Sequence, residues 1–446
     1  MKKQVLSVWV FCSALGIAQA QTDVTKEYLV NPSFETLKTA DGSTDVAVKT
    51  TLENGLYGWE VASMSNYQVE SEASGSATGF PADGSGKIKP TEGTYYYFNR
   101  QGWGNKDSEL KTTTSKELPT GTYYAVIDYK AADYSNNNNA KNNGTTLGIK
   151  VNDAASNLLG ENPAVRRAYS MANNSSNPGS DAYMVNAAWN ELGTMFTVTE
   201  PTTVTISLVQ HMKNSGRSDI AWDNLRLYKI ENVDESKPLD VSGLITTSNY
   251  YALGGWSIEG GNTFQINTWS TEGDTDGSGM TTPFFEDWIG KGTNAANATI
   301  SHTANHLAPG IYEVSGLIRV LNEAGGAAPS GATLYANEGS TDACAGTPCT
   351  NGVYGTYTVK GTVGTDGVLT FGIKVANANF NWLSFKNFKL QYLGTASIDQ
   401  LKATLKEKMT EAQSKESISY LSPLSDCDLL LRQTRVGRAA AKCRID

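Results

Sequence analysis

The sequence of 446 residues predicts an all-β protein in which one domain occurs twice. The chain has 43 glycines and only 18% charged residues, which is typical of many short strands joined by turns. In segment 220–230, Leu225 and Leu227 lie on one face of an extended chain and Arg226 lies on the other. This two-residue period indicates a half-buried strand. A similar strand at 385–390 indicates that a domain ends at each of the two places.

Three further segments occur in the same order ahead of each closing strand. The corresponding pairs are 118–129 with 307–320, 146–152 with 333–337, and 193–208 with 355–373. Four segments in register indicate two copies of one domain with loops of unequal length. Because the repeat period is well over about 100 residues, it indicates a domain duplication and not a solenoid.

The first copy contains Asn31-Pro-Ser-Phe-Glu35, then Gly58-Trp59, and finally the closing strand Trp222-Asp-Asn-Leu-Arg-Leu227. In these motifs it resembles the carbohydrate-binding, galactose-binding-like modules of secreted proteins from polysaccharide-degrading Gram-negative bacteria. The resemblance covers about residues 28–230 and, less fully, 241–394. It implies two tandem jelly-roll β-sandwiches that recognise a polysaccharide or glycan. The second copy lacks the Asn-Pro-Ser-Phe-Glu motif, so the two copies need not bind equally.

The N-terminus predicts export. Two lysines follow Met1, an apolar run extends over 5–17, and Ala18-Gln-Ala20 precedes Gln21. This order is typical of a secretory signal peptide, here residues 1–20. We expect a periplasmic, cell-surface or extracellular protein. No later segment approaches the roughly 18 uninterrupted apolar residues of a membrane span.

These features divide the chain into a first sandwich at 21–230, a charged linker at 231–240 and a second sandwich at 241–394. Residues 395–416 predict a short amphipathic helix, with a capping box formed by Ser397 and Gln400. Its apolar stripe needs a partner, either the second domain or another protein. The arginine-rich tail at 417–446 has no strand or helix period, and we interpret it as a truncated or frame-shifted reading or as a basic interaction tail.

Charge and cysteines limit the partners and cofactors. The net charge of −9 argues against nucleic-acid binding through bulk charge and fits a neutral or weakly charged glycan. Cys344 and Cys349 flank a turn and predict a local disulfide in an exported protein. Segment 274–279 resembles half of a calcium loop, but Phe285 stands where an EF-hand has Glu, so we favour a hairpin turn. We expect no cofactor, although the resemblance allows a structural calcium whose ligands are unknown.

No arrangement of residues in the sequence indicates catalysis. His302 and His306 are four residues apart but lack the Glu of a zinc-protease helix, so we expect surface or turn histidines. No Gly-x-Ser-x-Gly elbow occurs. The acidic residues form no pair in a recognisable glycosidase context. The expectation is therefore a protein that is not an enzyme.

Aromatic residues are the best candidates for sugar contact. A sugar ring presents a flat face of C–H bonds, which an exposed aromatic ring can cover while nearby amides and charged groups bind the hydroxyls. The predicted carbohydrate-binding residues are Asn99, Arg100, Gln101 and Trp103 in the first copy and Trp269 and Trp288 in the second. The remaining tryptophans in strand contexts are expected in the cores, namely Trp59, Trp222, Trp256 and Trp382.

Two other functions stay open on this evidence. The sandwiches could serve as a structural or adhesion scaffold with protein partners. The chain could also be an ancillary fragment of a larger glycan-active enzyme, because jelly-roll folds host unrelated functions.

Overall fold

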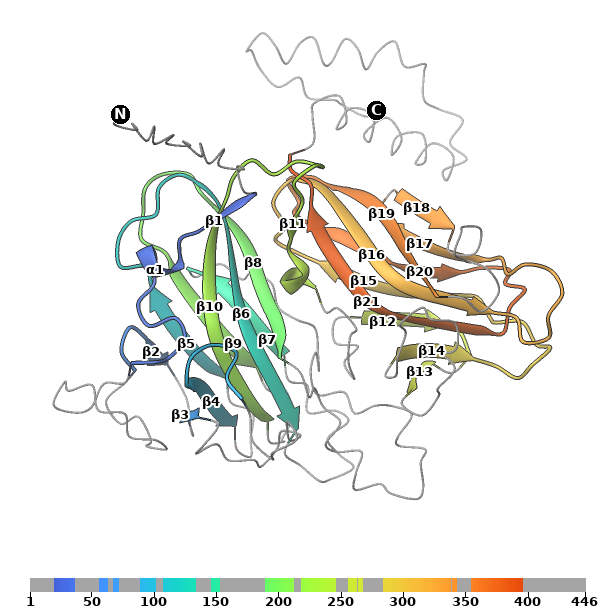
Figure 1. Cartoon of the computed structure of the whole chain (residues 1–446), viewed down its shortest axis with the longest axis horizontal. Helices are drawn as coiled ribbons and strands as arrows, with labels where there is room; N and C mark the ends of the chain where they lie inside the picture. Colours follow the sequence, from blue (N-terminus) through green and yellow to red (C-terminus); the bar gives the residue numbers. More distant parts are fainter. Residues whose placement is uncertain are drawn as a thin grey trace, which may run out of the picture. The chain divides into compact units, whose positions relative to one another are not determined.

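The computed structural model describes most of both predicted sandwiches. The described residues are 20–36, 56–62, 67–71, 89–101, 107–133, 146–152, 189–211, 218–245, 256–262, 264–267, 284–337, 339–342 and 354–395. They form four antiparallel sheets, which confirms the predicted all-β sandwich fold (Figure 1). Except for Ala20 and Thr395, the predicted signal peptide, C-terminal helix and tail lie outside the described residues.

The first sandwich pairs a large sheet with a smaller one. The large sheet has the order β3 (Tyr67–Ser71), β4 (Tyr95–Gln101), β10 (Ser218–Ile230), β6 (Gly121–Asp133) and β8 (Asn190–Val198), and β1 (Gln21–Asp23) also pairs with β10. The smaller sheet has the order β2 (Glu60–Ala62), β5 (Ser108–Thr113), β9 (Thr205–His211) and β7 (Thr146–Val151). One short helix, α1 (Thr25–Tyr28), follows β1.

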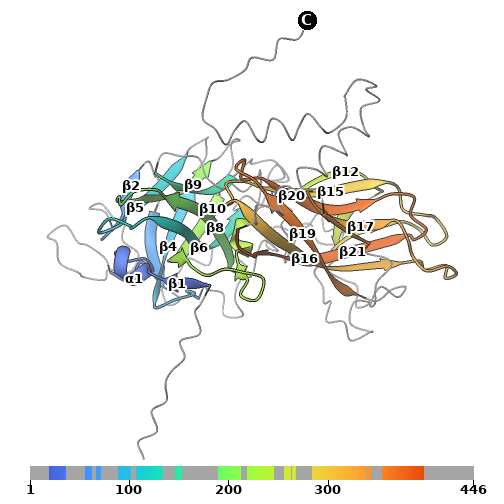
Figure 2. The same cartoon turned by 90° about the horizontal axis from the view of Figure 1, so that it is seen from above.

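The second sandwich repeats this order. Its large sheet runs β13 (Phe264–Asn267), β14 (Phe284–Trp288), β21 (Trp382–Tyr392), β16 (Gly310–Leu321) and β19 (Gly355–Val363), with β11 (Leu239–Asp240) beside β21. The other sheet runs β12 (Trp256–Gly260), β15 (Ala298–Ala304), β20 (Leu369–Val375), β17 (Ala332–Ala336) and β18 (Gly339–Asp342). Figure 2 shows β12, β15 and β20 in one layer and β16 and β21 in the other. Because β11 pairs with β21, the end of the predicted linker at 231–240 is a strand.

Alternate side chains of the large sheets fill the two cores, as the two-residue period predicts. In the first sandwich, Trp222 on β10 lies opposite Tyr97 on β4 and Tyr129 on β6, and all three are buried. The equivalent row of the second sandwich contains Phe285, Phe385 and Ile318. Trp59 and Trp256 are also buried among core residues, in agreement with the sequence-based expectation.

A β-bulge occurs at the same place in both closing strands. Asn224 in β10 has a φ of 54° and Asn387 in β21 has a φ of 57°, and the register against the neighbouring strand shifts at each. Asn is among the few residues that tolerate this left-handed region. Asn224, within the 222–227 motif, therefore forms a bulge, and this bulge fixes which side chains face outward on either side of it.

His302 departs from the expectation. It lies on β15 between Ile300 and Ala304, whose side chains also face the core, and it is buried. Its ring stacks on Phe371 with 5.2 Å between centroids and meets Trp256 edge-on at 5.3 Å. The surface interpretation was wrong because the strand alternation directs residue 302 inward. His306, in contrast, is exposed in a turn. Burial lowers the pKa of His302 to about 4.

This burial predicts a loss of stability in mild acid. In the unfolded chain His302 is protonated near the ordinary histidine pKa of about 6.5, whereas in the folded chain it stays neutral until the pH approaches 4. The neutral histidine therefore has no cost to the folded state above pH 6.5, and the free energy of unfolding decreases as the pH falls from there toward 4. We expect His302→Phe to reduce the fall in unfolding free energy between pH 7 and pH 4.5 by about 2 kcal/mol. Denaturant unfolding at several pH values measures this effect.

The matched control is His306→Phe, which changes an exposed histidine and should leave the pH dependence as it is. His302→Gln serves as a second variant if the larger phenyl ring disturbs the core. Parallel pH profiles for the original protein and both His302 variants would contradict the assignment.

Candidate functional site

The outer face of the second large sheet carries an unusual set of polar and aromatic side chains. Glu286 on β14, Ser384 on β21 and Arg319 on β16 lie in one row, because Ser384 is the register partner of both other residues. The next row contains Trp288, Trp382 and Leu321. Both rows alternate with the core row of Phe285, so their side chains face away from the core. We call these two rows, with Tyr354, Glu323 and Asn381, the outer-face site.

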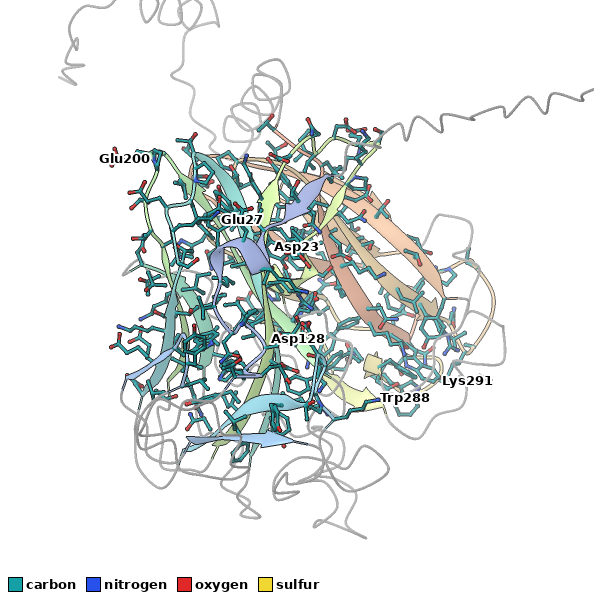
Figure 3. The ribbon with its side chains drawn as sticks, turned by 60° about the vertical axis from the view of Figure 1, so that its left-hand side comes forward. Asp23, Glu27, Asp128, Glu200, Trp288 and Lys291 are labelled. Carbon is teal, nitrogen blue, oxygen red and sulfur yellow. The ribbon has the colours of Figure 1, made fainter. Side chains whose placement is uncertain are left out.

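Trp288 is the exposed aromatic of this site. Its side chain is 44% exposed at the end of β14, and only Tyr57 is a comparably exposed large hydrophobic residue in the described part of the chain (Figure 3). The indole N–H donates a hydrogen bond to Glu323 Oε2 at 3.0 Å. An exposed tryptophan side chain would ordinarily exchange between rotamers. The hydrogen bond to Glu323 restricts the orientation of the Trp288 ring.

Asn381 holds the acceptor of that bond in place. Its Nδ2 donates to Glu323 Oε2 at 2.6 Å and to the Ile289 carbonyl at 2.9 Å, while its Oδ1 accepts from the Glu323 backbone N–H at 2.9 Å. The amide is buried, so these bonds face little competition from water. Asn381 therefore connects the end of β14 to the chain that leaves β16.

The interior part of the site combines one cation with two aromatic rings. The Arg319 guanidinium carbon lies 4.7 Å from the centre of the Trp382 ring and 5.2 Å from that of Tyr354. The Trp382 indole N–H donates to Glu286 Oε2 at 2.8 Å. Trp382 is buried as predicted, but it lies on the outer face of the sheet and outside the main core.

Burial raises the pKa of Tyr354. The Ser384 and Arg319 side chains next to the Tyr354 hydroxyl oppose that rise through hydrogen bonding. The hydroxyl is therefore protonated at neutral pH and is able to donate a hydrogen bond. Phe284 packs beside it, with ring centroids 6.2 Å apart and planes at 63°. The site thus combines one exposed indole face in a fixed orientation with a guanidinium, two carboxylates, an amide and two hydroxyls, most of which are buried on the same side of the sheet.

The structure places the predicted sugar-contacting residues unevenly. Trp288 is in the outer-face site. Asn99 is buried inside the first sandwich, where its Nδ2 donates to Ser108 Oγ and Gln210 Oε1, so its amide joins the two sheets. Arg100 and Gln101 end β4, and their side chains are not described. Four further predicted residues lie outside the described part, namely Trp103 and Trp269 and the expected disulfide partners Cys344 and Cys349.

The sequence-based prediction missed most of the other residues of the outer-face site. Glu286 stands between Phe284 and Trp288 at the outward positions of one strand, and Arg319 occupies an outward position within an apolar run. The signal available in the sequence was a charged residue at an outward-facing position of a largely apolar strand. Asn381 and Tyr354 precede strands and carried no periodic signal.

A separate polar cluster belongs to the first sandwich. Asp223 Oδ2 accepts hydrogen bonds from the backbone N–H groups of Thr91 and Glu92 and from the Thr91 hydroxyl. Burial nevertheless raises the pKa of Asp223 to about 7. Next to it, Asp128, which is labelled in Figure 3, forms an ion pair with Arg226 at 2.7 Å. These contacts tie loop residues to the bulge of β10, which is a structural role.

The described residues contain no group of three His, Cys, Asp or Glu side chains positioned to hold a metal ion. The structural calcium allowed by the sequence stays a prediction. Within the same described ranges, no helix has the length and apolar character needed to cross a membrane.

Comparisons with known proteins show similarity to solved structures alone, since no family model and no curated protein matches. TmCBM61 in complex with β-1,4-galactotriose is 15% identical, with a TM-score of 0.26 over 45% of this chain and 97% of that one. The tandem CBM22 domains of Paenibacillus barcinonensis Xyn10C are 10% identical, with a TM-score of 0.23 over 85% and 99%. A cyclase from Fischerella sp. TAU is 15% identical, with a TM-score of 0.26 over 46% and 97%. Carbohydrate-binding modules are thus among the structural neighbours, but scores this low carry no argument about function.

Asn381 gives a test of how the site is built. Replacing it by Ala leaves the Ile289 carbonyl and the Glu323 N–H without their buried partner, so we expect the unfolding free energy to fall by about 1–3 kcal/mol. Asn379→Ala is the control, because that amide makes similar backbone bonds at an exposed position and should cost less. Denaturant unfolding measures both changes, and equal losses would contradict a special role for Asn381.

Proposed function

We propose that this protein binds a polysaccharide or glycan through the outer-face site. The observation that carries the proposal is Trp288, an exposed indole held in one orientation by Glu323 and flanked by polar side chains on the same sheet face. A sugar stacks its C–H face on such a ring and bonds its hydroxyls to neighbouring polar groups. Because a single stacked ring contributes only about 1 kcal/mol beyond burial, each site should bind weakly.

The binding is proposed to be non-catalytic. The two carboxylates of the site each accept a hydrogen bond from an indole, Glu286 from Trp382 and Glu323 from Trp288. Groups used in this way position aromatic rings and do not form the acid and base pair of a glycosidase. We further propose an exported location, which the signal-peptide pattern at residues 1–20 supports.

The direct test is glycan binding by the full chain and by Trp288→Ala. We expect the substitution to weaken binding about tenfold or more, since it removes the stacking surface. Tyr57→Ala is the matched control, because Tyr57 is similarly exposed but belongs to the first sandwich. Isothermal titration and a glycan array of plant, host and microbial polysaccharides provide the measurement, with chain length of the bound glycan checked after incubation.

Each outcome has a defined meaning. Binding that survives in folded Trp288→Ala would move the function away from this site. A flat array for the original protein would reject sugar binding altogether, and shortening of the bound glycan would reject the non-catalytic proposal.

A further inference from the structure

The two sandwiches provide an internal comparison of the same surface. In the first sandwich, Ala221 on β10 pairs with Phe98 on β4 and Lys130 on β6. In the second, Ser384 on β21 pairs with Glu286 on β14 and Arg319 on β16. Both rows lie the same number of residues before the bulge Asn, at Asn224 and at Asn387. The three positions of one row are therefore equivalent to those of the other.

A fourth position extends the equivalence. Trp189 directly precedes β8, and Tyr354 directly precedes β19, the strand in the same place of the second sheet. The Lys130 ammonium lies 5.7 Å from the Trp189 ring centre, just as Arg319 lies over Tyr354. Each of these rings also has an edge-on aromatic neighbour at 6.2 Å, Tyr96 beside Trp189 and Phe284 beside Tyr354. The cation and its aromatic partners are thus duplicated.

The chemistry around the duplicated cation differs between the copies. In the first copy, Phe98 and Ala221 form a buried cluster with Tyr96, and the partly buried Trp189 packs against it. The equivalent residues of the second copy are Glu286, Ser384 and Tyr354, so Phe98 and Ala221 are replaced by side chains with hydrogen-bonding groups, and the Trp189 indole, which donates to the Lys89 carbonyl, is replaced by a phenol. Since the first copy uses apolar residues at these positions, the fold itself does not require polar ones there.

The polar groups of the second copy satisfy one another only in part. Ser384 and Arg319 lie close enough to the Tyr354 hydroxyl to oppose the rise of its pKa, but Arg319 Nε and Nη1 and the two hydroxyls are buried and make no hydrogen bond of good geometry in the described part of the chain. Arg319 is 6% exposed, so its two free donors lie in a poorly solvated place. An unsatisfied buried polar group is unfavourable by about 1–3 kcal/mol, more when charged. Such a cluster is expected where a ligand supplies the missing acceptors.

The arrangement of donors on this surface, and not its net charge, favours a ligand group with acceptor oxygens. The outward-facing charged residues here are Arg319 and Lys386 against Glu286 and Glu323, and Glu323 accepts the Trp288 indole N–H. Glu286 already accepts the Trp382 indole N–H. Arg319 has only donors to offer, so its partner has to bring acceptor oxygens, and a charged acceptor gives the stronger bonds.

We propose that Arg319, Tyr354 and Ser384 form a subsite for a negatively charged substituent of a sugar, a uronate carboxylate or a sulfate ester, next to Trp288. This inference rests on the proposed glycan binding and specifies its ligand class. The Arg319 guanidinium acts locally against the net charge of −9 of the whole chain. The equivalent surface of the first sandwich lacks the hydroxyls of Tyr354 and Ser384, so the preference for charged sugars belongs to the second sandwich.

The test uses the full chain with pairs of polysaccharides that differ in charge alone. Polygalacturonate and glucuronoxylan are compared with their carboxyl-reduced forms, and chondroitin sulfate with its desulfated form, by titration calorimetry. We expect the charged member of a bound pair to bind about tenfold or more tightly. The carboxylate and sulfate pairs show which substituent the subsite accepts.

Variants then locate the preference. Arg319→Gln should bring the ratio of the affinities for the charged and neutral polysaccharides to about one, while binding of the neutral form persists through Trp288. Ser384→Ala introduces the residue that the first sandwich has at this position, so it should fold, and it should lower the ratio several-fold. Lys360→Gln is the charge-matched control, because Lys360 belongs to the same sheet but pairs with Glu235 at its surface. It should leave the ratio unchanged.

The outcomes separate the two proposals. Equal binding of charged and neutral forms, or a ratio that is unchanged in Arg319→Gln and Ser384→Ala, would overturn the subsite and leave sugar binding intact. A ratio lost in Lys360→Gln as well would show a general charge effect and would also overturn it. If neither member of any pair binds, the proposed function fails together with the subsite.

Discussion

The rest of this structure depends on the alternation of side chains across two antiparallel sheets. Alternate residues of the large sheets have to be apolar because they fill the space between the layers, as Tyr97, Trp222 and Tyr129 do in the first sandwich. The residues between them are released from that requirement. The outer face is therefore the surface on which this fold can carry chemistry without loss of its core.

The bulge in each closing strand sets where this outer surface changes. The extra residue at Asn224 or Asn387 shifts the pairing register by one residue. The strict inward–outward alternation of side chains along the strand is therefore interrupted at the bulge. In the first sandwich the residues next to the bulge are used for structure, since Asp223 receives three hydrogen bonds from residues 91 and 92 and Asp128 pairs with Arg226. In the second sandwich the row before the bulge contains Ser384 and Arg319. This row is equivalent to the Ala221 row of the first sandwich, so the structural cluster of one copy and the candidate site of the other lie in adjacent outward rows before the bulge.

The duplication also explains how the two copies diverged. A buried cation next to an aromatic ring occurs in both, as Lys130 with Trp189 and as Arg319 with Tyr354. A cation over a ring is favourable by about 0.5–2 kcal/mol, which helps to retain the charge in a poorly solvated place. Around this shared pair, the first copy has Phe98 and Ala221 where the second has Glu286 and Ser384. Divergence at outward positions leaves the cores unaffected, because the two faces of a sheet pack independently.

The sequence by itself determined the all-β class, the four repeated segments, the core positions of Trp59, Trp222 and Trp256, and Trp288 as a sugar-facing candidate. Each of these depends on local periodicity or residue type, which is readable along one strand. It did not determine that His302 is inward, since a polar residue at an apolar position was interpreted as surface. It also did not bring Glu286, Arg319, Tyr354 and Ser384 together. These residues come from four places in the chain separated by tens of residues, and only the pairing register of β14, β21, β16 and β19 makes them neighbours. The reason is physical: alternation tells which face a side chain is on, whereas strand order and register, decided by the packed sheets, tell what lies beside it.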